Sequence, residues 1–232
     1  PCPSYLICFA VGELMIVRDE DVTTMDGKTL PIAYIAPRGT NEQDLKLTFN
    51  KTRSIIKYLE DRIQVPFPDF GKYYQVIAPR VSSAMENISL VSWDNMFLQD
   101  ENYAKEWKVE TDIVVLHECS HSYFGDALVI RHFEHAWLKE SFAKFFEATW
   151  AGHEYGHNER MYEFYLQKVS YTHEADHEYV RPIVTNKYDS SWDLFDRHLY
   201  PGGSWRLHML MNLLGEKVFW RGIKNYVQQF YS

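Results

Sequence analysis

The sequence has few cysteines, no long apolar run and no excess of positive charge. Its three cysteines, Cys2, Cys8 and Cys119, cannot all pair within one chain, and so small a number favours a reducing compartment such as the cytoplasm. No apolar stretch reaches the roughly 20 residues that a membrane-spanning helix needs. The formal net charge of −8 argues against a nucleic-acid partner and favours a ligand that carries a cationic group.

The sequence also lacks internal repeats, low-complexity tracts and long linkers. Apolar residues make up 46% and charged residues 24% of its 232 residues, a balance typical of a globular protein that buries a core. Aromatic residues reach 16%, which suits a packed helical domain with an aromatic-lined cleft. Because the chain begins with Pro1 rather than Met, we expect the natural N-terminus and any signal peptide to lie outside this sequence.

Hydrophobic periodicity predicts an α+β fold, a small sheet followed by mostly helical structure. Near the N-terminus, short apolar runs and the turn signal Asp26-Gly27 favour strands, whereas later apolar residues recur at helical spacing. The predicted strands are residues 4–10, 14–17, 30–36, 74–78 and 88–93. The predicted helices are residues 41–63, 110–121, 136–150, 158–171, 205–214 and 222–232, with a polar loop over 97–108.

One stretch carries a metal-binding pattern. It reads His-Glu-Cys-Ser-His over residues 117–121 and follows an apolar, proline-free lead-in. On a helix, residues four apart share a face, so His117 and His121 can hold one Zn²⁺ together. Glu118 stands beside them as a general base for water. A site of this kind needs a third protein ligand, which Glu140 can supply from a second helix.

The same short pattern occurs again at residues 173–177. Its neighbours are polar and Pro182 follows closely, so this segment offers no apolar face to bury. We interpret the second copy as a chance match in an acidic loop over residues 172–179. The alternative is a surface metal-binding pair of His173 and His177.

The first copy resembles the signature of the gluzincin metallopeptidases, and among them the family of aminopeptidase N and leukotriene A hydrolase. That signature is His-Glu-x-x-His, eighteen residues and then Glu; here residues 122–139 are the eighteen, and Glu140 follows. The family also carries an upstream Gly-x-Met-Glu-Asn motif. Its counterpart here comes about thirty residues before the histidines and consists of Ser83, Ala84, Met85, Glu86 and Asn87.

The resemblance implies a thermolysin-like zincin catalytic domain with one Zn²⁺ per chain. It implies that His117, His121 and Glu140 bind the metal, that Glu118 is the general base and that residues 83–87 bind substrate. Within that segment, Glu86 would hold the substrate's α-ammonium. If residues 88–93 form an edge strand beside the zinc, an extended peptide could pair with it.

A third resemblance to the same family concerns Tyr200 and the residues that follow it. The family pattern is Tyr-x-Lys-Gly-Ala/Ser before a helix, and Tyr200, Gly203 and Ser204 fit it. The resemblance implies that Tyr200 donates a hydrogen bond to the tetrahedral oxyanion. Each of these roles has a structural alternative. Glu86 can be a solvated acid on the surface, and Tyr200 can be one of many tyrosines that only pack.

The sequence departs from the family pattern at four positions. We expect these substitutions to alter local backbone geometry or packing rather than to remove a ligand. Because adjacent helical residues point to different faces, Lys139 should not block Glu140. The departures are Ser83 and Ser141 where Gly is usual, Lys139 where Asn is usual, and Gly202 where Lys is usual.

We therefore predict a zinc-dependent aminopeptidase that hydrolyses the N-terminal residue from peptides with a free N-terminus. Residues 40–232 would form the catalytic domain and residues 1–39 the end of a preceding β-rich domain, so flanking domains of the same protein would be missing. A non-catalytic scaffold on the same fold is one alternative, against which the intact ligands argue. A zinc epoxide hydrolase of the leukotriene A hydrolase type is another, against which Phe124-Gly125-Asp126 and residues 83–85 argue, since they resemble the aminopeptidase N branch.

Overall fold

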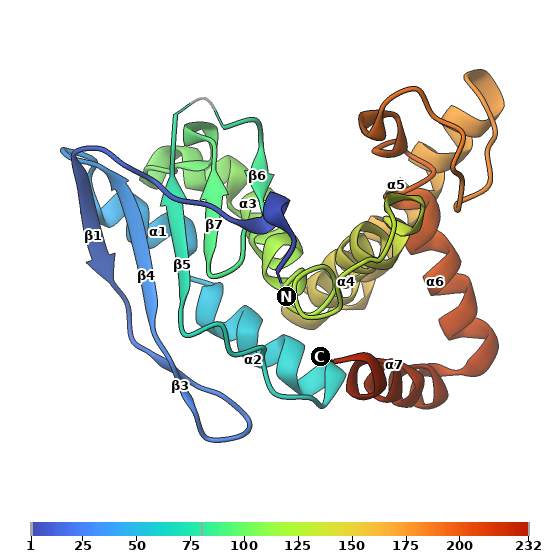
Figure 1. Ribbon diagram of the computed structural model, residues 1–232, viewed down its shortest axis with the longest axis horizontal. Coiled ribbons are helices and arrows are strands. Elements are labelled where there is room, and N and C mark those ends of the chain that lie inside the picture. The colour runs from blue at the N-terminus through green and yellow to red at the C-terminus, as the bar shows by residue number, and fades with distance from the viewer. Residues whose placement is uncertain (1, 80, 232) are drawn as a thin grey trace. The chain divides into compact units, whose positions relative to one another are not determined.

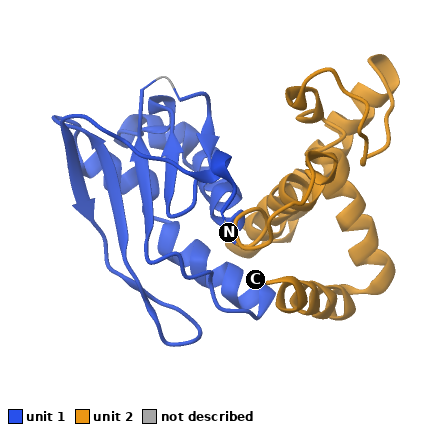
Figure 2. Cartoon of the chain, viewed as in Figure 1, with its two compact units in different colours: residues 1–122 blue, residues 123–232 orange. Residues whose placement is uncertain are grey.

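The chain divides into two compact units, residues 1–122 (unit 1) and 123–232 (unit 2), as Figure 2 shows. The computed structural model describes residues 2–79 and 81–231. Pro1, Arg80 and Ser232 lie outside the described residues, as do the outer limits of the two predicted domains at residues 1 and 232. All the named strands belong to unit 1, and the described part of unit 2 is built from helices and loops (Figure 1). The predicted α+β order of a small sheet followed by mostly helices is confirmed.

Unit 1 is organised on a five-stranded sheet with the order β1-β4-β5-β7-β6. The inner pairs β4–β5 and β5–β7 are parallel, and the outer pairs β1–β4 and β6–β7 are antiparallel. Strands β2 and β3 form a separate antiparallel hairpin around the predicted Asp26-Gly27 turn. The strands are β1 (Leu14–Arg18), β2 (Val22–Thr23), β3 (Thr29–Leu30), β4 (Ile32–Pro37), β5 (Tyr73–Ile77), β6 (Ala84–Met85) and β7 (Leu90–Trp93).

Three α-helices belong to unit 1, and its core joins them to the sheet. α1 (Glu42–Phe49) and α2 (Thr52–Ile63) form the crossover between the parallel strands β4 and β5, and both contact α3 (Glu101–Ser120). The ring of Phe49 lies 5.3 Å from that of Tyr34 on β4 and 5.4 Å from that of Trp93 on β7. This aromatic contact fixes α1 on the sheet, and α3 in turn packs against α1.

Unit 2 is a helical assembly in which α4 contacts both α5 and α6. Its core is aromatic: the ring of Phe145 lies 5.7 Å from Phe164 on α5 and 5.3 Å from Phe219 on α7. Among the described residues, no helix is both long and apolar enough to cross a membrane. The helices are α4 (Trp137–Glu154), α5 (His157–His177), α6 (Pro201–Leu214) and α7 (Glu216–Phe230).

Two N-terminal predictions differ from the structure. Residues 4–10 form no strand; a single 3₁₀ turn covers Ser4–Leu6. The predicted helix 41–63 is two helices, the first of which is capped by Asn41, whose side chain accepts a hydrogen bond from the Gln43 N–H at 2.9 Å. The break follows from the Phe49 carbonyl, which accepts hydrogen bonds from the side chains of Tyr34 and Thr52.

The predicted polar loop over residues 97–108 is also wrong, because α3 begins within it at Glu101. Asp100 caps this helix, and one carboxylate oxygen accepts from the backbone N–H groups of Asn102 and Tyr103 at 2.9 and 2.7 Å. The charged residues that follow are mostly exposed, so the first half of α3 is a solvated helix face rather than a loop.

Candidate active site

The predicted zinc histidines lie at the C-terminal end of α3. The apolar residues before them, including Val115 and Leu116, are fully buried and anchor this end of the helix in the core. The rings of His117 and His121 are one turn apart, with centroids 4.9 Å from each other. Two imidazoles side by side on one helix face are a donor set that suits Zn²⁺.

Glu86, Glu118 and His121 converge within unit 1. One carboxylate oxygen of Glu86, one of Glu118 and a ring nitrogen of His121 all lie within 4.8 Å of one another, and all three residues are buried. The strand β6 contacts α3 at this point, which brings a residue from the 83–87 segment to the zinc-binding motif. Two buried carboxylates so close together create a strongly negative site that suits a bound cation or an ammonium group.

The segment 83–87 forms a tight edge of the sheet. Ala84 pairs with Trp93 and Met85 with Ser92, so β6 is the last strand on this side and β7 is an inner strand. The strand predicted at 88–93 is confirmed as β7, but the condition that it lies at the edge is not met, because the edge strand is β6. Asn87 is buried and its side-chain oxygen accepts from the Ser92 hydroxyl at 3.0 Å, which fixes the turn beside Glu86.

Ser83 has a left-handed backbone, with φ of 67°. This conformation favours glycine because a Cβ atom crowds the carbonyl that follows. Ser83, the residue before β6, stands where the family pattern has Gly. It adopts the left-handed backbone that glycine favours, at some cost in backbone strain. Its carbonyl accepts from the Asp94 N–H at 2.8 Å, which holds the strained turn in place.

Glu140 lies in the first turn of α4 in unit 2, and its side chain is buried. The neighbouring Lys139 is also buried, and its ammonium group forms an ion pair with the Glu140 carboxylate. The same ammonium lies 5.7 Å from the ring centroid of Phe195. Although adjacent helical residues point to different faces, the long lysine side chain folds back onto its neighbour, so a positive charge accompanies the predicted third ligand.

Tyr200 immediately precedes α6 and is half-buried. Its backbone N–H donates to the Asp196 carbonyl at 3.2 Å, and its own carbonyl accepts from Ser204 N–H at 3.1 Å. The first residues of α6 include Gly202 and Gly203, so little side-chain bulk follows Tyr200.

Both glycines after Tyr200 are required by close packing within unit 2. A Cβ on Gly202 would lie 2.7 Å from a ring carbon of Tyr171, so the lysine that is usual in the family does not fit here. A Cβ on Gly203 would lie 1.8 Å from the hydroxyl oxygen of Ser141 on α4. Ser141 donates to the Leu199 carbonyl at 2.7 Å, which ties α4 to the segment before Tyr200.

The second His-Glu-x-x-His copy is helical, and its interpretation as a loop is wrong. Residues 173–177 form the last turn of α5, which ends at His177. Glu174 is buried and bound to the segment before Tyr200, a feature that residue-by-residue polarity did not reveal. His173 and His177 are exposed, and α5 continues to His177, past the end of the predicted helix 158–171.

Cys119, which lies between the two predicted zinc histidines in the sequence, is fully buried. Burial raises the pKa of its thiol, so the group stays protonated at neutral pH. This agrees with a packing role for Cys119 rather than a role as metal ligand.

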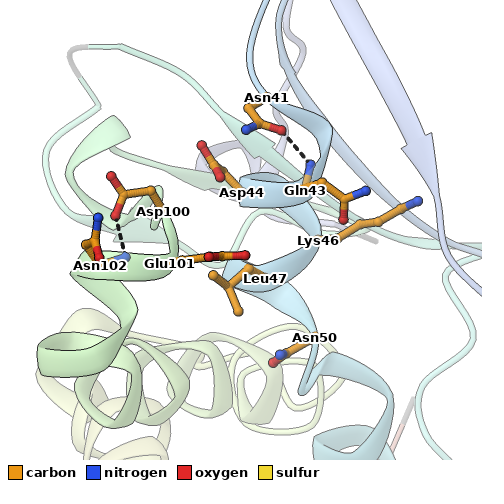
Figure 3. Close-up of a pocket in the computed structure, with 9 residues that line it drawn as sticks. All are labelled: Asn41, Gln43, Asp44, Lys46, Leu47, Asn50, Asp100, Glu101 and Asn102. Carbon is orange, nitrogen blue, oxygen red and sulfur yellow. Dashed lines mark hydrogen bonds between the residues drawn. The ribbon is translucent and has the colours of Figure 1, made fainter.

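A surface hollow of about 770 Å³ lies away from these residues, between the N-terminal ends of α1 and α3 (Figure 3). Two of its polar side chains are helix caps: Asn41 accepts from the Gln43 N–H, and Asp100 from the Asn102 N–H. Lys46 on its rim pairs with Glu42 one turn earlier in α1. Because these groups serve the helix ends, we do not assign a ligand to the hollow.

The chain is similar to known aminopeptidases over nearly all of its length. It is 29% identical over 230 residues to aminopeptidase N of Lactobacillus delbrueckii subsp. lactis, covering 96% of this chain and 27% of that protein. It is 26% identical over 247 residues to glutamyl aminopeptidase of Bos taurus, covering 99% of this chain and 24% of that protein. The chain thus spans about a quarter of the length of these curated relatives.

The fold is similar to that of a solved M1 zinc metallopeptidase from Deinococcus radiodurans. The TM-score is 0.72 at 22% identity, over 95% of this chain and 45% of that one. A mutant of the same protein, solved with a bound Tyr-Ser-Ala substrate, gives a TM-score of 0.73. This likeness confirms the predicted zincin-type fold.

The model of the peptidase family M1 domain matches residues 47–232, which include both predicted zinc histidines, Glu118, Glu140 and Tyr200. The match covers well over half of the chain. The chain therefore belongs to peptidase family M1.

Proposed function

We propose that the chain carries the active site of a zinc aminopeptidase, which hydrolyses the first peptide bond of substrates with a free N-terminus. The observation that carries the proposal is the convergence of Glu86, Glu118 and His121 within 4.8 Å. It puts the carboxylate proposed to hold the substrate's α-ammonium beside the proposed general base and a proposed ligand. An α-ammonium held by Glu86 beside the general base would restrict hydrolysis to the first residue.

The proposed metal ligands are His117, His121 and Glu140. Two imidazoles and one carboxylate fit a catalytic Zn²⁺, which needs three protein ligands and an open position. When bound, Zn²⁺ supplies Lewis-acid polarisation of the scissile carbonyl and lowers the pKa of water to about 7.

Three side chains act in the proposed reaction. Glu118 accepts a proton from the attacking water and later delivers it to the leaving amine. Glu86 accepts a charge-assisted hydrogen bond from the α-ammonium and so sets the position of the scissile bond. Tyr200 donates a hydrogen bond to the oxyanion of the tetrahedral intermediate.

The relatives support peptides as the substrate class. The curated relatives are aminopeptidases, and the solved mutant of the Deinococcus radiodurans enzyme was bound to a Tyr-Ser-Ala substrate. A tripeptide with a free N-terminus is the kind of ligand that the negative cluster of Glu86 and Glu118 suits.

The test is hydrolysis of an aminoacyl chromogenic amide by the zinc-loaded chain, compared with the same amide after N-acetylation. We expect cleavage of the free-amine form alone. Glu118→Gln should lower kcat by about 10² to 10⁴-fold, the usual contribution of a general base. Glu110→Gln, an exposed carboxylate on the same helix, is the matched control and should leave the rate unchanged.

Each other outcome has a distinct meaning. Equal cleavage of both amides would reject the Glu86 anchor and indicate a less selective peptidase. A chain that binds zinc but cleaves neither amide would reject the enzyme and support the non-catalytic scaffold. Hydrolysis of an epoxide but of no amide would support the epoxide hydrolase alternative.

A further inference from the structure

The second His-Glu-x-x-His copy contributes to a polar cluster in unit 2, which we call the Tyr200 support and in which Glu174 and His198 are buried. The cluster joins the end of α5 to the loop just before Tyr200. It comprises Glu174, Tyr179, Arg181, Asp196 and His198.

Glu174 holds the loop from the α5 side. One carboxylate oxygen accepts from the Arg197 backbone N–H at 3.1 Å, and the other accepts from Nδ1 of His198 at 2.6 Å. Glu174 is 5% and His198 is 1% exposed, so both lie in a low-dielectric setting where such bonds are strong. The other ring nitrogen of His198 accepts from the Arg181 backbone N–H at 3.3 Å, so His198 links two segments.

Asp196 holds the same loop from the other side. Arg181 donates to both of its carboxylate oxygens at 2.6 Å, a two-pronged ion pair. The Tyr179 hydroxyl and the Leu199 backbone N–H also donate to Asp196, at 2.7 and 2.8 Å. Although burial alone would raise it, the hydrogen bonds from Arg181 and Tyr179 hold the pKa of the Asp196 carboxyl below its usual value.

A metal site is the competing interpretation, because Glu174, Asp196 and His198 have donor atoms within 4.8 Å of one another. The contacts argue against it. The oxygens of both carboxylates already accept hydrogen bonds, and the Arg181 guanidinium occupies the cationic position. The histidines of the motif do not join the cluster either: Nδ1 of His177 donates to the His173 carbonyl, and His173 accepts from Arg197.

The bonds of the cluster fall on consecutive residues of one short loop. Arg197, His198 and Leu199 are each bound through the backbone or side chain, and Tyr200 follows at once. The Tyr200 N–H donates to the carbonyl of Asp196, the residue that Arg181 holds. The backbone of Tyr200 is therefore fixed by the cluster on one side and by α6 on the other.

We propose that Glu174 and His198, with Asp196 and Arg181, are positioning residues that hold Tyr200 where its hydroxyl meets the oxyanion. The proposal rests on the proposed function and deepens it. It gives the second copy of the motif a role in the same reaction, through Glu174 alone. These residues act through Tyr200 and do not touch the substrate.

The test is a double-mutant cycle of Glu174→Ala with Tyr200→Phe. Because the oxyanion contact exists only in the transition state, Glu174→Ala should lower kcat by about 10 to 100-fold with KM changed less than about twofold. In the Tyr200→Phe background, the same change should cost almost nothing more. An equal loss in both backgrounds would mean a general structural role and would overturn the proposal.

Two companion variants keep the test interpretable if Glu174→Ala folds poorly. His198→Asn places an amide donor where Nδ1 lies and should keep most of kcat, whereas His198→Leu should lose it like Glu174→Ala. The matched control is His177→Gln, which changes an exposed residue of the same motif and should leave kcat unchanged. A kcat for His198→Leu equal to that of the control would overturn the proposal.

A measurement independent of activity separates this proposal from the proposed function. Hydrogen exchange of residues 195–200 should become faster in Glu174→Ala and stay unchanged in His177→Gln. No change in exchange would overturn the positioning role. If the wild type cleaves no amide but Glu174→Ala still exchanges faster, the support of the loop by Glu174 would stand and the proposed aminopeptidase would be rejected.

Zinc content distinguishes the Tyr200 support from a metal site. We expect one zinc per chain both in the wild type and in Glu174→Ala. A second zinc in the wild type that Glu174→Ala loses would favour the metal site instead.

Discussion

At the scale of single residues, the candidate site combines side chains from different segments of the chain. Glu86 directly follows the strand β6, and its approach to Glu118 and His121 at the end of α3 is a tertiary contact that local pattern does not reveal. The motif spacing could be predicted from sequence because a helix repeats every 3.6 residues. The ion pair of Lys139 with Glu140 could not, since it depends on how a long, flexible side chain is buried.

Ser83 is a residue whose substitution should stabilise the chain. With φ at 67°, Ser83→Gly removes Cβ crowding worth about 1–2 kcal/mol, offset in part by the larger backbone freedom of unfolded glycine. We expect a net gain of roughly 0.5–1 kcal/mol in the free energy of unfolding, measured by denaturant titration. Ser82→Gly is the matched control, because φ at Ser82 is not positive, and it should destabilise slightly. A loss of stability in Ser83→Gly would contradict this account.

At the scale of elements, most helices and strands could be predicted, but several of their ends could not. The helix 41–63 divides because Tyr34, remote in sequence, binds the Phe49 carbonyl. α5 continues past the predicted end because Glu174 finds partners on a loop more than twenty residues later. Both outcomes depend on contacts between distant segments, which periodicity in one segment does not encode.

The contact between α4 and α6 yields a prediction about packing. Gly203→Ala would place a methyl group into Ser141, so we expect a loss of about 1–3 kcal/mol in the free energy of unfolding. Adding Ser141→Gly should restore most of it, since the clashing atoms are removed. Gly222→Ala on α7 meets nothing within 4 Å and should instead stabilise by about 1 kcal/mol through helix propensity. Equal effects of the two Gly→Ala changes would refute the close approach.

At the scale of the whole molecule, the predicted fold class is confirmed, whereas the division of the chain at residue 39 stays a prediction. β4, within the predicted upstream segment, pairs with β5 beyond it, so strands from both sides of residue 39 share one sheet. The proposed zinc ligands come from two helices: His117 and His121 lie at the end of α3, and Glu140 lies in the first turn of α4.

Zinc binding should stabilise the folded chain, because the ion binds the folded state and not the unfolded one. We expect Zn²⁺ at 100 times its Kd to add about 2.7 kcal/mol to the free energy of unfolding, and a chelator to reverse the rise in Tm. Glu140→Ala should bind zinc at least about tenfold more weakly, judged from the loss caused by outer-sphere changes. Glu147→Ala, a buried acid on the same helix that pairs with Lys144, should keep the zinc-dependent rise in Tm. An unchanged zinc affinity in Glu140→Ala would rule Glu140 out as a ligand.

The reactivity of the buried Cys119 thiol can report local opening of α3. Cys2 is exposed and Cys8 is partly exposed, so both are open to alkylation in the native chain, whereas Cys119 can react only when the end of the helix leaves its packed surroundings. The rate at which Cys119 is alkylated therefore reports how often the segment that carries His117 and His121 opens. Cys119 is thus a native probe of local opening at the end of α3, and no cysteine has to be introduced.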